Sequence, residues 1–109
     1  MIPSDILRGH TDTIILARLT EGDSYGYIIN KTIQEKTQGA FELKEATLYT
    51  TFRRLEQAGL IESYWGGEAT GARRRYYRIT DAGRAVYAEN VRDWRRAKKL
   101  IDTLIDGEE

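Results

Sequence analysis

The sequence of 109 residues contains no cysteine, one histidine and one proline. Without cysteine there is no disulfide framework and no thiolate metal site, and nothing points to an oxidising compartment. His10 is the single histidine, so a metal site built from several histidines is excluded too. A domain of this size must therefore rely on its hydrophobic core or on association with another chain.

Net charge is also absent, because 17 Lys and Arg balance 17 Asp and Glu. Taken over the whole chain, this balance predicts no general attraction to nucleic acid or to a membrane surface. The longest apolar run is Ile14 to Ala17, far short of the roughly 20 residues that span a bilayer. The chain does not open on a basic segment followed by an apolar one, so we expect a cytoplasmic protein with no membrane partner.

Apolar residues spaced by three and four predict four helices, at about residues 12–20, 25–38, 45–58 and 81–105. Small polar residues precede these segments and glycines follow two of them, as is typical of helix ends. The expected N-terminal caps are Thr11 or Asp12, Asp23 or Ser24, and Thr80, and the expected C-terminal glycines are Gly39 and Gly59.

Short strands are predicted between these helices. Residues 41–43 alternate in polarity, and residues 60–65 and 75–79 flank a glycine-rich polar loop, which predicts a hairpin. The order helix, helix, short strand, helix, hairpin, helix is typical of a winged helix-turn-helix. We therefore expect a mostly α (α+β) fold, with a DNA-binding domain in residues 1–80 and a C-terminal dimerisation helix in residues 81–109.

Basic charge is concentrated in the third expected helix and the hairpin, where residues 45–79 hold six arginines against four acidic residues. Arginine suits phosphates and guanine edges, and the exposed helix face adds hydroxyls and a tyrosine. The alternative is a solvated helix face and a charged hairpin edge that prevents aggregation. The DNA-binding candidates are Thr47, Tyr49, Thr50, Arg53 and Arg54 on the helix, Arg73, Arg74 and Arg75 on the hairpin, and Tyr27 in the second helix.

The last helix carries a broad apolar stripe with the spacing of a coiled-coil seam, including Val91, Trp94, Ile101 and Ile105. This stripe favours a homodimer, whose two-fold symmetry suits a palindromic operator. Two alternatives remain: packing against the first helix of the same chain, or recruitment of another protein, which would make the chain a protein-interaction module. Trp94 itself fits either a dimer core or the aromatic wall of a ligand pocket, and the residues alone favour the core.

Catalytic patterns are missing from the sequence. It has no Ser, His and Asp in a triad order, no glycine-rich phosphate loop and no cluster with metal-ligand spacing. We therefore expect a protein that is not an enzyme and that needs no cofactor or metal.

Several segments carry a family resemblance, in their order as well as their residues: Leu7–His10, Tyr25–Tyr27, Phe41–Leu43, Glu45–Tyr49, Arg53–Glu56, Gly59–Ile61 and Arg73–Thr80. Over about residues 6–105 the chain resembles the PadR family of transcriptional regulators. Residues 45–50 and 63–66 are similar to its short, multidrug-binding branch. The resemblance implies a homodimeric repressor that binds a palindromic operator and is released by a small planar aromatic effector at the dimer interface.

The resemblance also assigns residues to the effector site and reverses the preference on Trp94, which matches a tryptophan lining the ligand pore. Lys98 stands where that branch has an acidic residue, which favours anionic or neutral aromatics over cationic drugs. The implied ligand residues are Ile6, Thr13, Ala17, Val91, Trp94 and Lys98, and the expected dimer interface is Ile6, Leu7, Val91, Trp94, Leu100, Ile101, Leu104 and Ile105.

Overall fold

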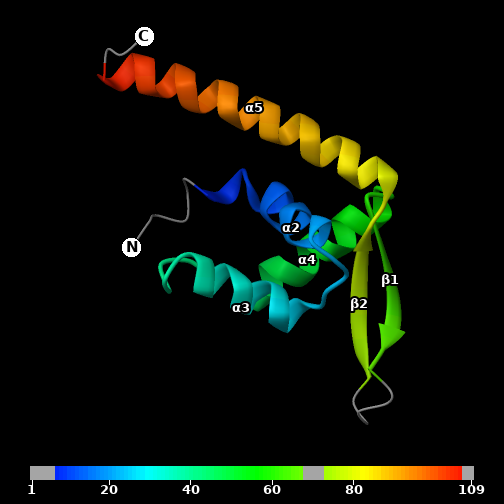
Figure 1. Ribbon diagram of the computed structural model, residues 1–109. Helices are drawn as coiled ribbons and strands as arrows, with labels where there is room; N and C mark the ends of the chain where they lie inside the picture. Colours follow the sequence, from blue (N-terminus) through cyan, green and yellow to red (C-terminus); the bar gives the residue numbers. More distant parts are fainter. Residues whose placement is uncertain (1–6, 68–72, 107–109) are drawn as a thin grey trace.

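The computed structural model describes residues 7–67 and 73–106. Three short helices are followed by a two-stranded antiparallel hairpin and one long helix (Figure 1). This order confirms the predicted winged helix-turn-helix fold. The elements are α2 (Thr11–Thr20), α3 (Gly26–Lys36), α4 (Glu45–Gln57), β1 (Ile61–Gly66), β2 (Arg74–Ile79) and α5 (Asp81–Asp106).

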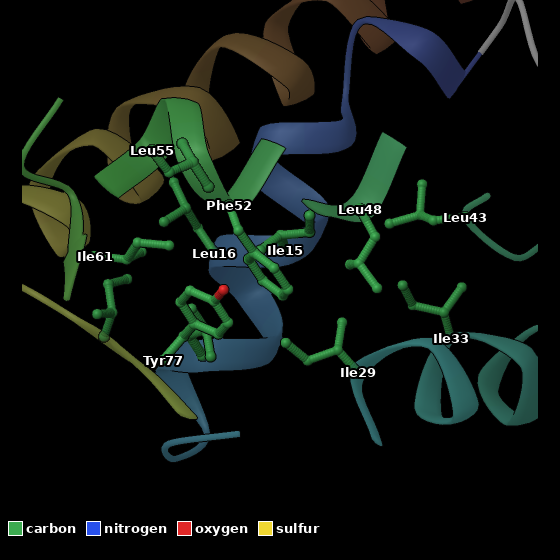
Figure 2. Packing of buried hydrophobic residues seen from close by; sticks show 12 residues of the cluster. Ile15, Leu16, Ile29, Ile33, Leu43, Leu48, Phe52, Leu55, Ile61 and Tyr77 are labelled. Carbon is green, nitrogen blue, oxygen red and sulfur yellow. The ribbon is translucent and has the colours of Figure 1, made fainter. Parts of the chain in front are cut away.

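One hydrophobic core holds α2, α3, α4 and the hairpin together. Its centre is Phe52, whose ring stacks on Tyr77 with the ring centroids 3.9 Å apart (Figure 2). Burial of apolar side chains from three helices and both strands is the main force that fixes their arrangement. The buried cluster comprises Ile15, Leu16, Leu19, Ile29, Ile33, Leu43, Leu48, Phe52, Leu55, Ile61, Tyr77 and Ile79.

The hairpin is anchored at one end and projects from the helical body at the other (Figure 1). Its register runs from the pair Ile61 and Ile79, both buried, to the pair Gly66 and Arg74. Near the anchored end, Tyr77 exchanges backbone hydrogen bonds with Ser24, at 3.1 and 2.8 Å. This isolated bridge ties the loop before α3 to β2.

Two of the expected helix ends are confirmed. Gly59 directly follows the C-cap of α4 and has a φ value of +78°, a left-handed conformation that glycine adopts without strain. The end of α3 differs from the prediction, because its C-cap is Thr37 and the next residue is Gln38, with φ +50°, so Gly39, with φ +79°, lies one position further along. At the start of α5, the Thr80 hydroxyl accepts a hydrogen bond from the Gly83 N–H at 3.0 Å. That bond satisfies one of the free N–H groups of the first turn.

The two other predicted caps are wrong. Helix α2 begins after His10, and no side chain caps it, because Thr11 instead donates its hydroxyl to the Arg8 carbonyl. Helix α3 begins after Tyr25, also without a side-chain cap. The backbone of Ser24 is committed to the bridge with Tyr77, so tertiary pairing moves the start of this helix.

The strand predicted at residues 41–43 is also absent, although Leu43 is buried as its alternation indicated. The side chain of Asn30 takes the place of a neighbouring strand. Its amide accepts from the Leu43 N–H and donates to the Leu43 carbonyl, both at 2.8 Å. The segment is thus held in an extended form with its backbone polar groups satisfied.

Helix α5 packs on the body from its first turn to about Trp94, whose ring contacts His10. Gly83 is buried against Leu60, so closely that an added Cβ would collide with the Leu60 carbonyl. The 26 residues of α5 extend about 39 Å, and Figure 1 shows the helix crossing α2 and continuing beyond it. Within the described ranges, no helix is both long and apolar enough to cross a membrane.

Candidate functional site

Helix α4 has one buried face and one open face, as its sequence predicts. Leu48, Phe52 and Leu55 point into the core. Thr47 and Thr50 are exposed on the other side, together with both arginines of the helix. Hydroxyl and guanidinium groups on an open helix are suited to base edges and phosphates in a major groove.

The two neighbouring arginines of α4 differ in their partners. The Arg54 guanidinium donates to the Asp12 carboxylate at 2.6 Å, and this hydrogen bond raises the pKa of Arg54. Arg53 makes no hydrogen bond or ion pair with any described residue. Its donors are therefore available to an external anion, whereas a phosphate must displace Asp12 to reach those of Arg54.

Two hollows flank α4. The one beside α3 has a volume of about 320 Å³, and its walls include Tyr27 and Tyr49. Tyr27 is 67% exposed, while Tyr49 is 43% exposed and packs edge-on against Phe52. The hollow beside the start of α2 has a volume of about 490 Å³ and brings together Thr47, Thr50 and Arg54, with Asp12.

The three hairpin arginines predicted to bind DNA each lie over an aromatic ring. Arg73 and Arg75 lie over Trp65, at 4.9 and 5.9 Å from the ring centroid. Arg74 lies 5.0 Å from the ring of Tyr25. Each guanidinium thus has a defined position on the hairpin, as a cation above an electron-rich face.

A third hollow, of about 330 Å³, separates α2 from α5. Thr13 and Ala17 of α2 face Val91 and Trp94 of α5 there, so four of the six expected ligand residues meet in one apolar concavity. Leu7, Ile14 and Tyr87 add to its apolar walls, and the ring of His10 contacts Trp94 edge-on, with centroids 4.8 Å apart.

The other two expected ligand residues do not join them in this concavity. Lys98 is outside its walls and forms an ion pair with Asp102 at 3.4 Å. Ile6 is outside the described residues. Within one subunit, the charge of Lys98 therefore does not belong to the walls of this concavity.

The expected dimer residues include the most exposed apolar side chains of α5. Trp94 is 42% exposed, Leu104 is 82% and Ile105 is 76%. Leu100 and Ile101 are exposed between them. Val91 and Leu7 are half-buried and line the concavity already described.

A match to the model of the PadR-like family of transcriptional regulators spans residues 15–89, from the middle of α2 into α5. The chain belongs to this family. PadR-like regulators bind DNA, and the matched residues include all of α3, α4 and the hairpin.

Individual relatives agree with this PadR-like assignment. A transcriptional regulator from Clostridium thermocellum has a solved structure that matches with a TM-score of 0.86 and 48% identity, over 93% of this chain and 98% of that chain. An uncharacterised protein of Lysinibacillus sphaericus is 47% identical over 98% of both chains. Bacillus subtilis PadR in complex with operator DNA shares the fold, with a TM-score of 0.66 at 22% identity over 74% of this chain and 46% of that one.

Three residues of this PadR-like chain contact the candidate site residues although the sequence did not predict them there. Asp12 pairs with Arg54 across 42 residues of sequence, and His10 contacts Trp94 across the fold. Trp65 gives a sequence signal, since it stands in a polar hairpin beside arginines, but its partners depend on the register of the strands. Within the described part of the chain, no group of His, Cys, Asp or Glu side chains could hold a metal ion.

Proposed function

We propose that this PadR-like regulator is a homodimeric repressor acting in the cytoplasm. Residues up to about 80 form its DNA-binding domain, and the final helix joins two copies. Helix α4 and the hairpin bind a palindromic operator, and a planar aromatic effector between α2 and α5 releases the protein from it. The observation that carries the DNA-binding part is the open face of α4, where Arg53 has no partner among the described residues.

The exposed end of α5 supports the homodimer. Leu100, Ile101, Leu104 and Ile105 leave a contiguous apolar surface in water, which single subunits rarely tolerate. A two-fold partner covers this surface and fixes the spacing between two copies of α4, as a palindrome requires.

The concavity beside Trp94 supports the effector part. It has few polar groups and an aromatic wall, which suits a flat apolar ligand. Of the two helices that form it, α2 belongs to the DNA-binding domain and α5 to the proposed dimer interface. A ligand that separates α2 from α5 would therefore change how two DNA-binding domains are placed relative to each other.

The DNA-binding part is tested by selecting duplexes from a randomised pool with the full chain. We expect a short palindrome to be enriched, and its affinity to fall linearly with salt on a log–log plot. Arg53→Gln should weaken binding by about 1–3 kcal/mol per site, while Arg92→Gln on α5 is the matched control. Failure to enrich any duplex, or equal binding by the Arg53 variant and the parent, would contradict this part.

The effector part is tested by titrating planar aromatic dyes and following tryptophan fluorescence. The Trp65→Phe variant is used as the background, so that Trp94 is the single tryptophan that reports. We expect the dyes to quench it and to lower the affinity for the selected duplex. Trp94→Ala removes this reporter, so its dye binding is followed by the fluorescence of the dye itself; we expect that binding to be abolished, and unchanged dye binding would place the effector elsewhere.

The same exposed end of α5 also favours a second function, as a module that recruits a different protein. Light scattering separates the two. A stable homodimer leaves little apolar helix for another partner, whereas a monomer in solution favours recruitment.

A further inference from the structure

The hairpin carries an unusual number of contacts between arginines and aromatic rings. Arg73 and Arg75 lie over Trp65, Arg74 over Tyr25, and Arg78 over Tyr64. Energetically significant pairs of this kind occur about once per 70–80 residues in proteins. Four contacts within 6 Å of a ring centroid thus involve arginines of one hairpin, whereas a charged, aggregation-resistant edge needs no rings beneath its cations.

Trp65 has the most open position of these rings. It is the penultimate residue of β1 and pairs with Arg75 across the hairpin, close to the end that projects from the body. Its side chain is 53% exposed. Trp65 lies on the same face of β1 as the buried Ile61, four residues further along the strand and away from the core.

The two arginines on Trp65 are held differently. Arg75 donates to the Ser63 hydroxyl at 2.8 Å and lies 3.5 Å from a Glu56 carboxylate oxygen, so its guanidinium is tied to the body of the protein. Arg73, immediately before β2, contacts the indole alone among the described residues. Its five N–H donors therefore have no partner within the described chain.

A cation on a ring is positioned without losing its hydrogen-bonding capacity. The ring attracts the flat face of the guanidinium, and the donors lie around its edge. A phosphate accepts two of these donors side by side. Contact with the ring also limits the rotamers of a long side chain before binding, which lowers the entropy cost of the contact.

We propose that Trp65 is a positioning residue of the DNA interface, whose indole holds the Arg73 guanidinium with its donors directed to a phosphate of the DNA backbone. The proposal rests on the DNA binding proposed above and adds a contact that does not read sequence. Phosphate contacts are shared by all duplexes, so Trp65 acts equally on operator and on unrelated DNA.

The test compares three hairpin variants of the full chain on a labelled random-sequence duplex, by fluorescence anisotropy. Trp65→Leu should weaken binding about two- to fivefold per wing, the range expected for an exposed cation–ring contact. Trp65→Phe keeps a ring and should recover most of the loss, which a merely apolar role would not require. Arg73→Gln should weaken binding and lower the slope of log K against log salt by about 1 per wing.

The decisive measurement is the double variant. If Trp65 acts through Arg73, Trp65→Leu has no further effect in the Arg73→Gln background. Additive losses would overturn the proposal, as would full affinity in the Trp65→Leu variant. Equal thermal unfolding of parent and variants confirms that the fold is retained.

A second measurement keeps the proposal testable if Trp65→Leu fails to fold. In the Trp94→Phe variant Trp65 is the remaining tryptophan, and saturation with the duplex should shift its emission. A rise in anisotropy with no change in emission overturns the role of Trp65 while leaving DNA binding intact. No rise in anisotropy for the parent, in contrast, contradicts the proposed function itself.

Discussion

The two halves of α5 have opposite relations to the rest of the chain. In the first half Gly83 is buried against Leu60, and Tyr87 packs on the core cluster. In the second half Leu104 and Ile105 are 82% and 76% exposed, although they continue the same helix. One half is stabilised by its own chain, and the other leaves apolar surface that the other described residues do not cover.

This difference shows that length and amphipathicity of a helix do not by themselves say what the helix packs against. The spacing of apolar residues is the same in both halves, because a coiled-coil seam and a core-facing stripe follow nearly the same period. What separates the halves is where the small domain ends, since its contacts with α5 reach only to about Trp94 and the helix continues beyond α2 (Figure 1).

The largest effect, on the dissociation of the proposed dimer, is expected from introducing a charged residue into the exposed half of α5. Leu104→Glu places a carboxylate in the proposed dimer interface, at a cost of about 2 kcal/mol or more per copy. Two copies raise the dimer dissociation constant about a thousandfold, as measured by analytical ultracentrifugation. The neighbouring Thr103→Glu points to the other side of the helix and is the matched control.

The same variant also probes the other half. Because Leu104 contacts nothing in the core cluster, the dissociated subunit should keep its helical circular dichroism and its packed Phe52. If the Leu104 variant remains dimeric, the interface lies elsewhere and the comparison between the two halves loses its explanation.

An intermediate effect, on the free energy of unfolding, is expected from adding a methyl group to the buried half of α5. Gly83→Ala forces the new Cβ against the Leu60 carbonyl, and we expect a loss of about 1–3 kcal/mol in the free energy of unfolding. Alanine has the higher helix propensity, so a loss of stability reports the clash and not the helix. Gly9→Ala makes the same substitution where nothing lies within 4 Å, and urea unfolding of the two variants should separate them.

The smallest expected effect is a fall in the free energy of unfolding at alkaline pH, which arises from Tyr77 in the hydrophobic core. Burial raises the pKa of Tyr77 above its usual value of 10.0. Its stabilising contribution is therefore complete below pH 10 and is lost as the pH rises through the folded-state pKa. Tyr77→Phe should flatten the fall of unfolding free energy above about pH 10, measured by urea titration.

Tyr27→Phe, on an exposed ring, is the control for that titration. Residues 92–106 of α5 contain no tyrosine, so the alkaline effect on Tyr77 does not require the proposed dimer to dissociate. If the alkaline fall in the free energy of unfolding depended on protein concentration, it would involve dissociation of the dimer and contradict this prediction.

Local chemistry made much of the fold predictable. Gly59 ends α4 and Thr80 caps α5 through interactions within a few residues, and sequence reasoning found both. The cap at Ser24 and the strand at residues 41–43 were wrong for one shared reason. In each case distant groups, the Tyr77 backbone and the Asn30 amide, took the hydrogen bonds that local patterns had assigned.

The candidate site divides in the same way. The open face of α4 follows from helical periodicity once Leu48, Phe52 and Leu55 are placed in the core. The pairing of Arg54 with Asp12 does not follow, because it joins two helices that meet only in the folded chain. The ligand residues around Trp94 were predicted from the family resemblance, and four of them line one concavity in the structure.

The order of the four helices and the hairpin, the buried faces of the helices and the arginine-rich stretch within a chain of zero net charge all follow from the amino-acid sequence. The spacing of apolar residues and the amino-acid composition can be read along the chain, without knowing which distant residues come into contact. Which arginines keep unpaired donors depends on the folded arrangement, because distant segments of the chain supply their neighbours. Asp12 occupies Arg54 and the Trp65 ring holds Arg73, while Arg53 keeps its donors exposed.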